Sequence, residues 1–445
     1  MKRIAFHNLG CKVNTYELDA IIGEFKSHGY EIVSFDSKAD IYVINTCSVT
    51  NIADRKSRQI LHRARKLNPE SLIVATGCYV QTRDIDSLKK EGINLMVGNN
   101  LKGRLYEYVQ DYLLGGGNDS KIIVSNLAED RSYDDMHVDN SEEHTRVFIK
   151  IQDGCNQFCT YCIIPFARGR VRSRKPEDII DEIKTLTEKG YRELVITGIH
   201  ISSYGTDFIY DDVKADRFRP EYLLELIKRI AELKGVDRIR LGSLEPRIAT
   251  REFIGGLSRI KKVCPHFHLS LQSGSDSVLK RMNRHYTAAE YRECVEIIRD
   301  CYEHPAITTD VIVGFPGETE EEFRECAEYA KLIDFYEMHI FKYSRRAGTI
   351  ADKMKGQHTE ATKHERSCVL EEIDRRGREA FVRYYVGREV QVLFEEKKLI
   401  DGVEYWTGHT PEYVKVLYES KENLENSLVV VRGMDVKEDY LVAGR

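Results

Sequence analysis

Short apolar runs alternate with longer amphipathic stretches through the first quarter of the chain. The amphipathic stretches, residues 15–28 and 53–67, have the spacing of helices. The apolar runs, which predict strands, are residues 4–6, 41–44 and 72–75. This alternation is typical of a parallel sheet with helices on both faces. We therefore predict a doubly wound α/β domain over residues 1–112.

The alternation continues between residues 146 and 341. Pro176, which is followed by two acidic residues, marks the start of the first helix in this region. The predicted strands are residues 147–152, 193–197, 237–241, 267–271, 307–313 and 335–340. Six strand–helix units can form a partial (β/α)6 barrel, whose ligand sites would lie at the carboxyl ends of the strands. We assign residues 146–375 to this domain.

Near the carboxyl terminus, apolar and polar positions alternate over shorter runs. They follow a charged stretch at residues 359–379 that predicts a helix, and they comprise residues 389–394, 413–416 and 427–431. This pattern predicts a small OB-like β-barrel over residues 379–445. Residues 113–145, which include three consecutive glycines and an acidic stretch, predict a linker with one strand near residues 121–125.

Composition bears on the compartment and the partners. The chain has 445 residues and 11 cysteines, with no charged-then-apolar leader and no apolar run approaching 18 residues. We therefore expect a cytoplasmic protein with reduced thiols and no membrane contact. The formal net charge of -5 neither requires nor excludes a nucleic-acid partner.

Three cysteines, Cys155, Cys159 and Cys162, fall within eight residues just after the first predicted barrel strand. The spacing Cys-x3-Cys-x2-Cys can hold a 4Fe-4S cluster through three irons and leave the fourth iron open. An open iron can bind S-adenosylmethionine and pass it one electron, which yields a 5'-deoxyadenosyl radical. A partial zinc site is the alternative, although zinc motifs usually contain Cys-x2-Cys pairs.

Three further cysteines each follow a predicted strand of the first domain: Cys11, Cys47 and Cys78. The carboxyl ends of parallel strands share one edge of a sheet, so these thiols can converge although they are far apart in sequence. Taken singly, each is more often a buried apolar cysteine. Taken together, they predict a second 4Fe-4S cluster, with zinc as the leading alternative.

The two cysteine sets and the strings around them resemble the radical methylthiotransferase family over essentially the whole chain. The strings are Leu9-Gly10-Cys11-Lys12-Val13-Asn14, Asn45-Thr46-Cys47, Ala75-Thr76-Gly77-Cys78, Pro165-Phe166-Ala167-Arg168-Gly169-Arg170 and Gly314-Phe315-Pro316-Gly317-Glu318-Thr319. The resemblance implies an auxiliary cluster in the first domain, a radical S-adenosylmethionine barrel, and a carboxyl-terminal TRAM domain that meets the substrate.

The resemblance also implies a reaction. The string around Cys11, with Thr197-Gly198-Ile199-His200 and Ser203-Tyr204-Gly205, is most similar to the enzymes that act on N6-threonylcarbamoyladenosine in tRNA. Such an enzyme adds a methylthio group to C2 of this nucleoside beside the anticodon. S-adenosylmethionine serves as methyl donor and radical source, and a flavodoxin or ferredoxin supplies electrons. The alternatives are isopentenyladenosine in tRNA, an aspartate of a ribosomal protein, or a non-enzymatic iron-sulfur or zinc RNA-binding protein.

Residues near the predicted strand ends are candidate contacts for S-adenosylmethionine. Glu245 could accept hydrogen bonds from ribose hydroxyls, and Tyr161 could pack on adenine or shield the cluster. The full set is Tyr161, Thr197, Gly198, Ser243, Glu245, Gln272, Val313 and Gly314. Without the resemblance, the glycines could equally be turn residues. The cysteines act as ligands, so we assign no separate acid or base.

A basic run directly follows the Cys155 motif and predicts a strip that contacts tRNA phosphates. Its members are Arg168, Arg170, Arg172, Arg174 and Lys175. The carboxyl-terminal residues 379–445 depart from this picture, because nine Lys and Arg face thirteen Asp and Glu, a balance of -4. That balance would suit a basic protein substrate better than RNA, so the role of this domain in tRNA binding is in doubt.

Overall fold

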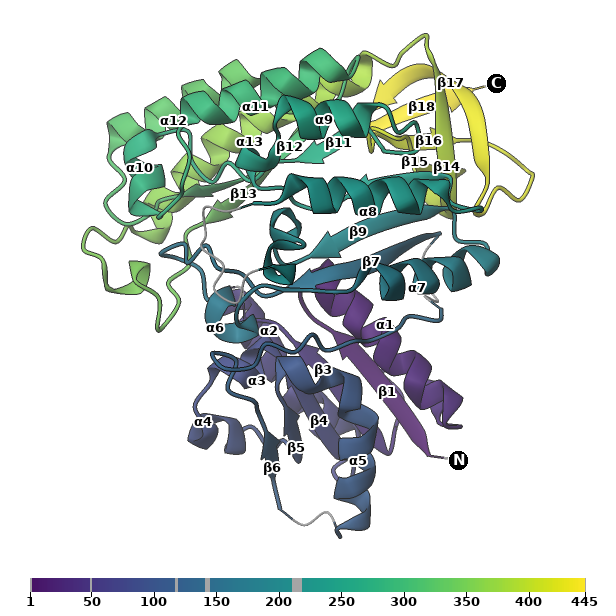
Figure 1. Cartoon of the computed structure of the whole chain (residues 1–445), viewed down its shortest axis with the longest axis vertical. Coiled ribbons are helices and arrows are strands. Elements are labelled where there is room, and N and C mark those ends of the chain that lie inside the picture. The colour runs from purple at the N-terminus through teal and green to yellow at the C-terminus, as the bar shows by residue number, and fades with distance from the viewer. Residues whose placement is uncertain (1, 49, 117–118, 141–144, 210–217, 445) are drawn as a thin grey trace.

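In the computed structural model, which describes residues 2–48, 50–116, 119–140, 145–209 and 218–444, the first strands form one parallel sheet (Figure 1). Its order is β2-β1-β3-β4-β5-β6. The strands are β1 (Arg3–Asn8), β2 (Glu31–Val33), β3 (Ile41–Thr46), β4 (Leu72–Gly77), β5 (Leu95–Val97) and β6 (Lys121–Ile123). The chain order reverses between β1 and β3, so the predicted doubly wound domain is confirmed.

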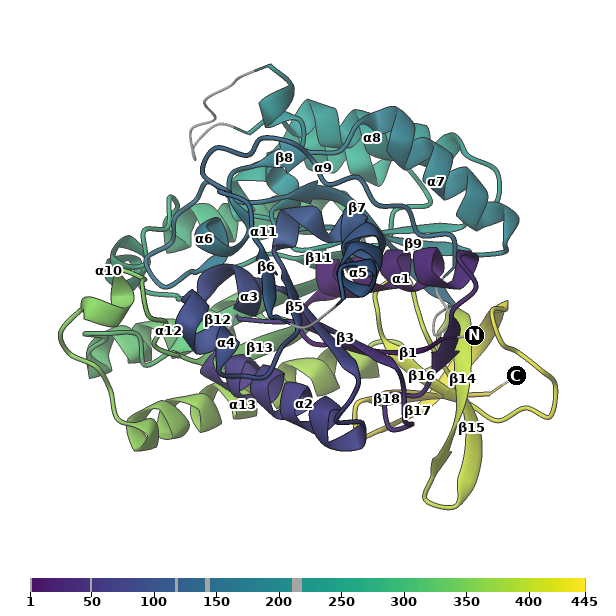
Figure 2. The same ribbon diagram turned by 90° about the horizontal axis from the view of Figure 1, so that it is seen from below.

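Alternate residues of these strands enter two different cores. Ile4, Val43 and Val74 pack against helix α1 (Lys12–Ser27) and α5 (Leu105–Leu114), whereas Tyr42 and Ile44 pack on the side of α2 (Asn51–Leu67). Figure 2 shows α1 and α5 on one side of the sheet and α2 on the other. The remaining helical segments of this domain are α3 (Cys78–Thr82), α4 (Ile85–Lys89) and η1 (Asn99–Arg104).

The second domain is an open, curved sheet. Two parts, β10-β9-β7-β8 and β11-β12-β13, are joined by the parallel bridges Ile239–Val263 and Leu244–Leu269. The strands are β7 (Arg146–Asp153), β8 (Arg172–Ser173), β9 (Glu193–Gly198), β10 (Arg238–Leu241), β11 (His266–His268), β12 (Ala306–Val313) and β13 (Glu337–Lys342). Except for the short β8, the strands run parallel, as a partial barrel requires.

Helices cover the outer face of this sheet (Figure 1). The helices of this domain are α6 (Ile164–Arg168), α7 (Pro176–Glu188), α8 (Pro220–Glu232), α9 (Arg251–Ser258), α10 (Asp276–Arg281), α11 (Ala288–Cys301), α12 (Glu320–Ile333) and α13 (Glu360–Arg383), with short segments η2 (Ile201–Ser203), η3 (Thr206–Phe208), η4 (Pro246–Ile248) and η5 (Ala351–Lys353). Of these, α6 lies at the junction of the two domains, against α3. Helix α1 of the first domain lies against β7 and β9, so the two domains share one apolar core.

The carboxyl-terminal strands form a closed barrel in the order β14-β15-β16-β18-β17. They are β14 (Glu389–Ile400), β15 (Val403–His409), β16 (Lys415–Tyr418), β17 (Leu428–Lys437) and β18 (Tyr440–Gly444). Among these strands β16 and β18 pair in parallel, and the others pair antiparallel, as in an OB-fold. The predicted OB-like barrel is confirmed.

The predicted linker, residues 113–145, contains β6 at the position where one strand is expected. β6 pairs with β5, so the first sheet extends past residue 112. The remaining described residues of this stretch run along the second domain, where Met136 and Val138 enter the shared core. The domain bounds inferred from sequence remain predictions.

Candidate active site

Cys11, Cys47 and Cys78 lie directly after β1, β3 and β4, which are neighbours in the sheet. Cys11 is exposed at the N-terminus of α1, and Cys47 and Cys78 are buried. Gly10, at φ 120°, lets the first loop approach the second, since a Cβ there would lie 3.1 Å from Cys47 Cβ and 3.2 Å from its Sγ. The topological switch point of the sheet therefore brings the cysteine loops together.

Hydrogen bonds fix the loops that carry these cysteines. The side-chain amide of Asn14 donates to the backbone carbonyls of Leu9 (2.6 Å) and Thr46 (3.2 Å), which lie shortly before Cys11 and Cys47. The side-chain amide of Asn45 donates in turn to the backbone carbonyl of Asn14 at 2.9 Å. Asn99 Nδ2 lies 3.4 Å from Cys78 Sγ. The Asn14 side chain therefore connects the loop that carries Cys11 to the loop that carries Cys47.

The Cys155, Cys159 and Cys162 loop leaves β7 through Gly154, whose φ is 71°. A Cβ at Gly154 would lie 1.8 Å from the Arg170 carbonyl oxygen, so no other residue fits there. The other side of the loop is held by residues 281–283: the Thr160 amide donates to the Met282 carbonyl at 3.0 Å, and Asn283 Nδ2 donates to the Phe158 carbonyl at 3.1 Å.

The electrostatics of this loop suit a bound cation. Burial, with a further contribution from Cys159, raises the pKa of Cys155 to about 12. Arg284 Nη1 lies 3.2 Å from Cys159 Sγ and is the nearby guanidinium. Thiols in such a setting ionise when a metal supplies the compensating charge. Three thiols in one loop are a donor set that fits iron ligation.

The spacing of the thiols bears on the zinc alternative. A single zinc ion needs its ligand atoms close together, because Zn–S bonds are about 2.3 Å long. Within the described residues, the one group of three or more such ligands whose donor atoms all lie within 4.8 Å is His268, Asp310 and His339. Neither cysteine set forms part of that group. A cluster places each thiolate on a different iron, and three thiols per set match the three protein ligands of a 4Fe-4S cluster with an open iron.

One cavity lies at the carboxyl ends of the barrel strands and touches both domains. It measures about 260 Å³. Tyr161, from the Cys155 loop, and Gln272 line it together with Thr50, which is three residues after Cys47. The other lining residues are Asp310, Ile312, Phe341, Lys342, Tyr343, Ser344 and Arg346. A substrate in this cavity would lie near both cysteine sets.

Comparison with known proteins identifies the family. Residues 149–330 match the radical SAM superfamily, and residues 3–98 match an uncharacterized protein family, UPF0004. The chain is 40% identical to threonylcarbamoyladenosine tRNA methylthiotransferase MtaB of Bacillus subtilis, over 97% of this chain and 94% of that protein. It is 35% identical to a tRNA-2-methylthio-N(6)-dimethylallyladenosine synthase of Thermoanaerobacter, over 98% of this chain and 91% of that protein.

The chain belongs to the radical S-adenosylmethionine methylthiotransferase family. The family prediction, the fold class and the assignment as an enzyme are therefore confirmed. In fold, the chain resembles the cobalamin- and [4Fe-4S]-containing methyltransferase TsrM of Kitasatospora setae, with a TM-score of 0.56 at 15% identity over 79% of this chain and 77% of that chain. No helix in the described residues is long and apolar enough to cross a membrane.

Several predicted S-adenosylmethionine contacts of this methylthiotransferase lie at barrel strand ends. Thr197 is buried and Gly198 half-buried at the end of β9, and Gln272 follows β11 in the left-handed region at φ 69°. Val313 ends β12, and the Gly314 amide donates to Glu318 Oε2 at 2.8 Å. These placements agree with the predicted positions. The roles of these residues remain predictions.

Glu245 and Ser243 differ in their surroundings. Ser243 is exposed, whereas Glu245 is buried and accepts hydrogen bonds from Arg247 Nε (2.8 Å) and from the Arg247 amide (3.0 Å). Arg247 Nη2 also lies 3.3 Å from Gln157 Oε1 in the Cys155 loop. The Glu245 carboxylate is therefore engaged by Arg247, which sequence reasoning did not identify, and is not free at a surface.

The predicted basic strip is wrong for three of its five members. Arg168, Arg172 and Arg174 are buried. Arg168 Nη1 contacts Glu17 Oε1 of α1 at 2.7 Å, and Arg172 Nη2 lies 4.0 Å from Asp153 Oδ2. Arg174 pairs with Glu182 and, at 2.8 Å, with Asp135. The physical reason is that carboxylates from distant segments neutralise these charges in the core. Arg170 is half-buried and Lys175 exposed, so these two can still meet RNA.

Arg284 and Glu17 are the main residues that sequence reasoning missed. Arg284 follows the Cys155 motif by more than a hundred residues, and nothing local signals its contact with Cys159. Glu17 lies on the apolar face of α1, between Val13 and Ile21, and Lys102 (2.5 Å), Lys150 (2.7 Å) and Arg168 surround it in the interface. Helical periodicity predicts the face but cannot predict its partner.

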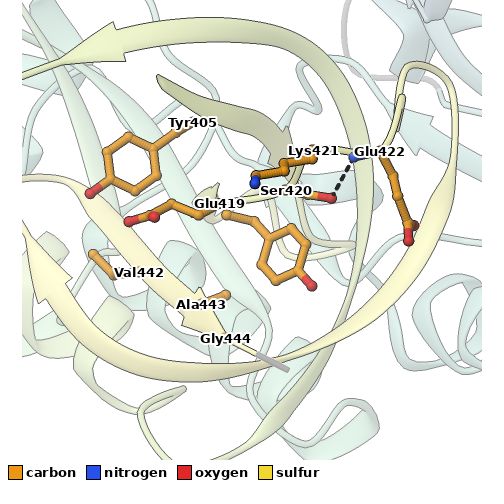
Figure 3. Close-up of a pocket in the computed structure, with 9 residues that line it drawn as sticks. Tyr405, Glu419, Ser420, Lys421, Glu422, Val442, Ala443 and Gly444 are labelled. Carbon is orange, nitrogen blue, oxygen red and sulfur yellow. Dashed lines mark hydrogen bonds between the residues drawn. The ribbon is translucent and has the colours of Figure 1, made fainter. Parts of the chain in front are cut away.

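A second cavity, of about 370 Å³, lies in the small barrel (Figure 3). Tyr405 and Tyr418 line it with the turn at Glu419–Glu422, where the Glu422 amide donates to Ser420 Oγ at 3.1 Å. All its lining residues belong to the small barrel, and none is a cysteine. We therefore place the chemistry at the interdomain cavity and not here.

Proposed function

We propose that this protein adds a methylthio group to C2 of N6-threonylcarbamoyladenosine beside the anticodon of tRNA, with two 4Fe-4S clusters and S-adenosylmethionine. The observation that carries the proposal is one cavity shared by both cysteine-bearing domains, in a chain 40% identical to proteins of that name. Replacing the unactivated C2–H bond with sulfur is chemistry for a radical, which the cluster and S-adenosylmethionine supply when bound.

The protein's own residues position the reactants. Cys155, Cys159 and Cys162 would hold the cluster that cleaves S-adenosylmethionine, while Cys11, Cys47 and Cys78 would hold the auxiliary cluster. Tyr161 lies in an apolar group with Phe315 and Tyr343 and lines the cavity, where it can limit water access. The target nucleoside must be unstacked from the anticodon loop to enter.

Arg170 and nearby aromatic rings are candidate contacts for the loop. The Arg170 guanidinium lies 4.6 Å from the centre of the Phe158 ring, and Phe158 meets the exposed Phe166 edge-on at 6.2 Å. A cation beside one half-buried and one exposed aromatic ring suits phosphate contact and base stacking. Arg170 and Lys175 are the two members of the predicted strip that are not buried, and they remain the candidate phosphate contacts. A flavodoxin or ferredoxin as electron donor and a cytoplasmic location complete the proposal.

The test is mass spectrometry of nucleosides from tRNA incubated with the anaerobically reconstituted protein, S-adenosylmethionine and a reductant. We expect a 2-methylthio form of threonylcarbamoyladenosine with the wild type and with Cys368→Ala, an exposed cysteine outside both sets. We expect none with Cys47→Ala. If 5'-deoxyadenosine forms but only dimethylallyladenosine in tRNA, or an aspartate of a ribosomal protein, gains a methylthio group, the substrate assignment is wrong.

A further inference from the structure

The inner face of the partial barrel is polar. On β10 to β12, Ile239, Phe267 and Val311 enter the apolar core beneath the helices. Alternate residues of a strand point to opposite faces, so their neighbours point into the barrel. Those neighbours on β10 to β13 include Arg238, Arg240, His266, His268, Asp310 and His339. Enclosing such groups costs free energy unless they find polar partners.

The lower part of this face already has partners. Arg240 donates to the Pro411 carbonyl at 2.8 Å, and Arg238 donates to the His409 carbonyl at 2.9 Å. Both side chains therefore bind the small barrel to β10 of the second domain. His266 Nδ1 is buried and, among the described residues, has no hydrogen-bond partner. One buried imidazole nitrogen of this face therefore lacks a partner among the described residues.

Above these arginines, His268, Asp310 and His339 form a compact trio on three adjacent strands. One ligand atom of each lies within 4.8 Å of the others. His268 Nε2 is 3.3 Å from Asp310 Oδ2, and the His268 and His339 rings stack with centres 5.5 Å apart. Asp310 also lines the interdomain cavity with Tyr161 and Gln272. Asp310 therefore links the trio to the cavity that Tyr161 of the Cys155 loop lines.

Lys12 adds a cation to this region. It directly follows Cys11, and within the described part of the chain no carboxylate lies within 4.0 Å of its ammonium group. Lys12 is exposed at the start of α1, the helix that packs against β7 and β9 of the second domain, and Asp310 and Arg240 are among the charged groups that act on it. A cation without a counter-ion, beside two imidazoles and a carboxylate, suits a ligand that carries an anion and N–H or O–H donors.

We propose that Lys12, His268, Asp310 and His339 bind the threonylcarbamoyl group on N6 of the target adenosine. The inference rests on the proposed function and identifies its specificity pocket. C2 and C6 of adenine both adjoin N1, so the N6 group must lie near the reacting carbon and therefore near Cys11. Lys12 and His339 face the carboxylate, and Asp310 accepts from the urea or hydroxyl. A hydrocarbon substituent leaves these groups unpaired, so the pocket selects against it.

The test compares anticodon stem-loop RNAs that carry threonylcarbamoyladenosine, its carboxylate methyl ester, or dimethylallyladenosine. For the first RNA, we expect His339→Leu and Lys12→Met to raise KM about 10- to 100-fold, the loss typical of one hydrogen bond to a charged group. Lys12→Arg, which keeps the charge, should recover most of it. His62→Ala, an exposed histidine on α2, is the matched control. Iron content should match the wild type in every variant, because no cluster ligand is changed.

The methyl ester provides an independent readout. The wild type should lose affinity for it by a similar factor, while Lys12→Met should lose little more, because the two changes remove the same contact. If the wild type modifies threonylcarbamoyladenosine and both variants keep its KM, the inference is overturned and the proposed function stands. If the wild type does not modify that RNA, the proposed function fails first. Zinc or manganese bound by the wild type but lost in His339→Leu would also overturn the inference and assign the trio to a metal.

Discussion

A single glycine decides whether the Cys155 loop can form. Gly154 and Gly317 have nearly the same φ, 71° and 73°, but a Cβ at Gly154 would meet the Arg170 carbonyl at 1.8 Å, whereas a Cβ at Gly317 meets nothing within 4 Å. Gly154→Ala should therefore displace the cluster loop, while Gly317→Ala costs only the left-handed backbone, about 1 kcal/mol. Iron analysis after reconstitution should show about half the wild-type iron for Gly154→Ala, since one of two clusters is lost.

The matched glycine separates loop displacement from general backbone strain. Gly317→Ala should keep the full iron content and the spectroscopic signals of both clusters. Equal iron in the two variants would show that the Arg170 segment can move away at little cost. The tight approach to Arg170 would then have no role in holding the Cys155 loop.

At the scale of elements, a buried charge network joins α1 of the first domain to β7 and α6 of the second. Glu17 is fully buried, with Lys102 and Lys150 as partners, and Arg168 Nη1 also lies 3.0 Å from Asp153 Oδ2. Burial alone would raise the pKa of Glu17, but Arg168 and the two lysines hold it well below its ordinary value. The network therefore stays charged in the interface.

Glu17→Gln should destabilise the protein strongly, because it leaves buried cations without their counter-ion. Removing one partner of a buried pair typically costs about 3–5 kcal/mol. Glu107→Gln removes one partner of an exposed pair with Arg104 on the same domain, so it should cost under about 1 kcal/mol. Thermal unfolding of both variants, followed by circular dichroism, measures the difference. Similar midpoints for the two variants would contradict the structural role of the network.

The same network shows how far sequence could predict the fold. Strand periodicity gave the order of elements, and strand ends placed all six cysteines, because both depend on local patterns. The basic run from Arg168 to Lys175 was misinterpreted, because its partners Glu17, Asp135 and Glu182 come from three other segments. Arg284 was missed for the same reason. Contacts between domains depend on how whole elements dock, which no local spacing encodes.

For the whole molecule, the attachment of the small barrel depends on ion pairs that acid should break. Glu193, at the start of β9, contacts Arg240 at 2.7 Å, and Arg240 in turn holds the carbonyls of Thr410 and Pro411. Burial alone would raise the pKa of Glu193, but Arg240 and the nearby Arg146 and Arg238 lower it to about 2. The neighbouring His409 has its pKa lowered by burial and pairs with Glu395 at 2.7 Å.

These shifts fix the sign of the pH dependence. The folded pKa of Glu193 lies below its ordinary value of 4.5, so its contribution to stability is fully present above pH 4.5 and is lost as the pH falls toward 2. The shift corresponds to on the order of 3 kcal/mol. His409, whose folded pKa is also lowered, acts in the same direction, since it resists the charge that the unfolded chain accepts below pH 6.5.

The Glu193→Gln variant distinguishes the contribution of Glu193 to the pH dependence of stability from that of His409. Unfolding midpoints of the wild type should fall steeply between pH 5 and pH 3, and the Trp406 fluorescence should report the small barrel, because this is the one tryptophan of the chain. The variant should be less stable at pH 7 and should lose less on acidification, because only His409 and the remaining carboxylates still titrate. Parallel curves for the two proteins would show that Glu193 does not couple protonation to attachment of the small barrel.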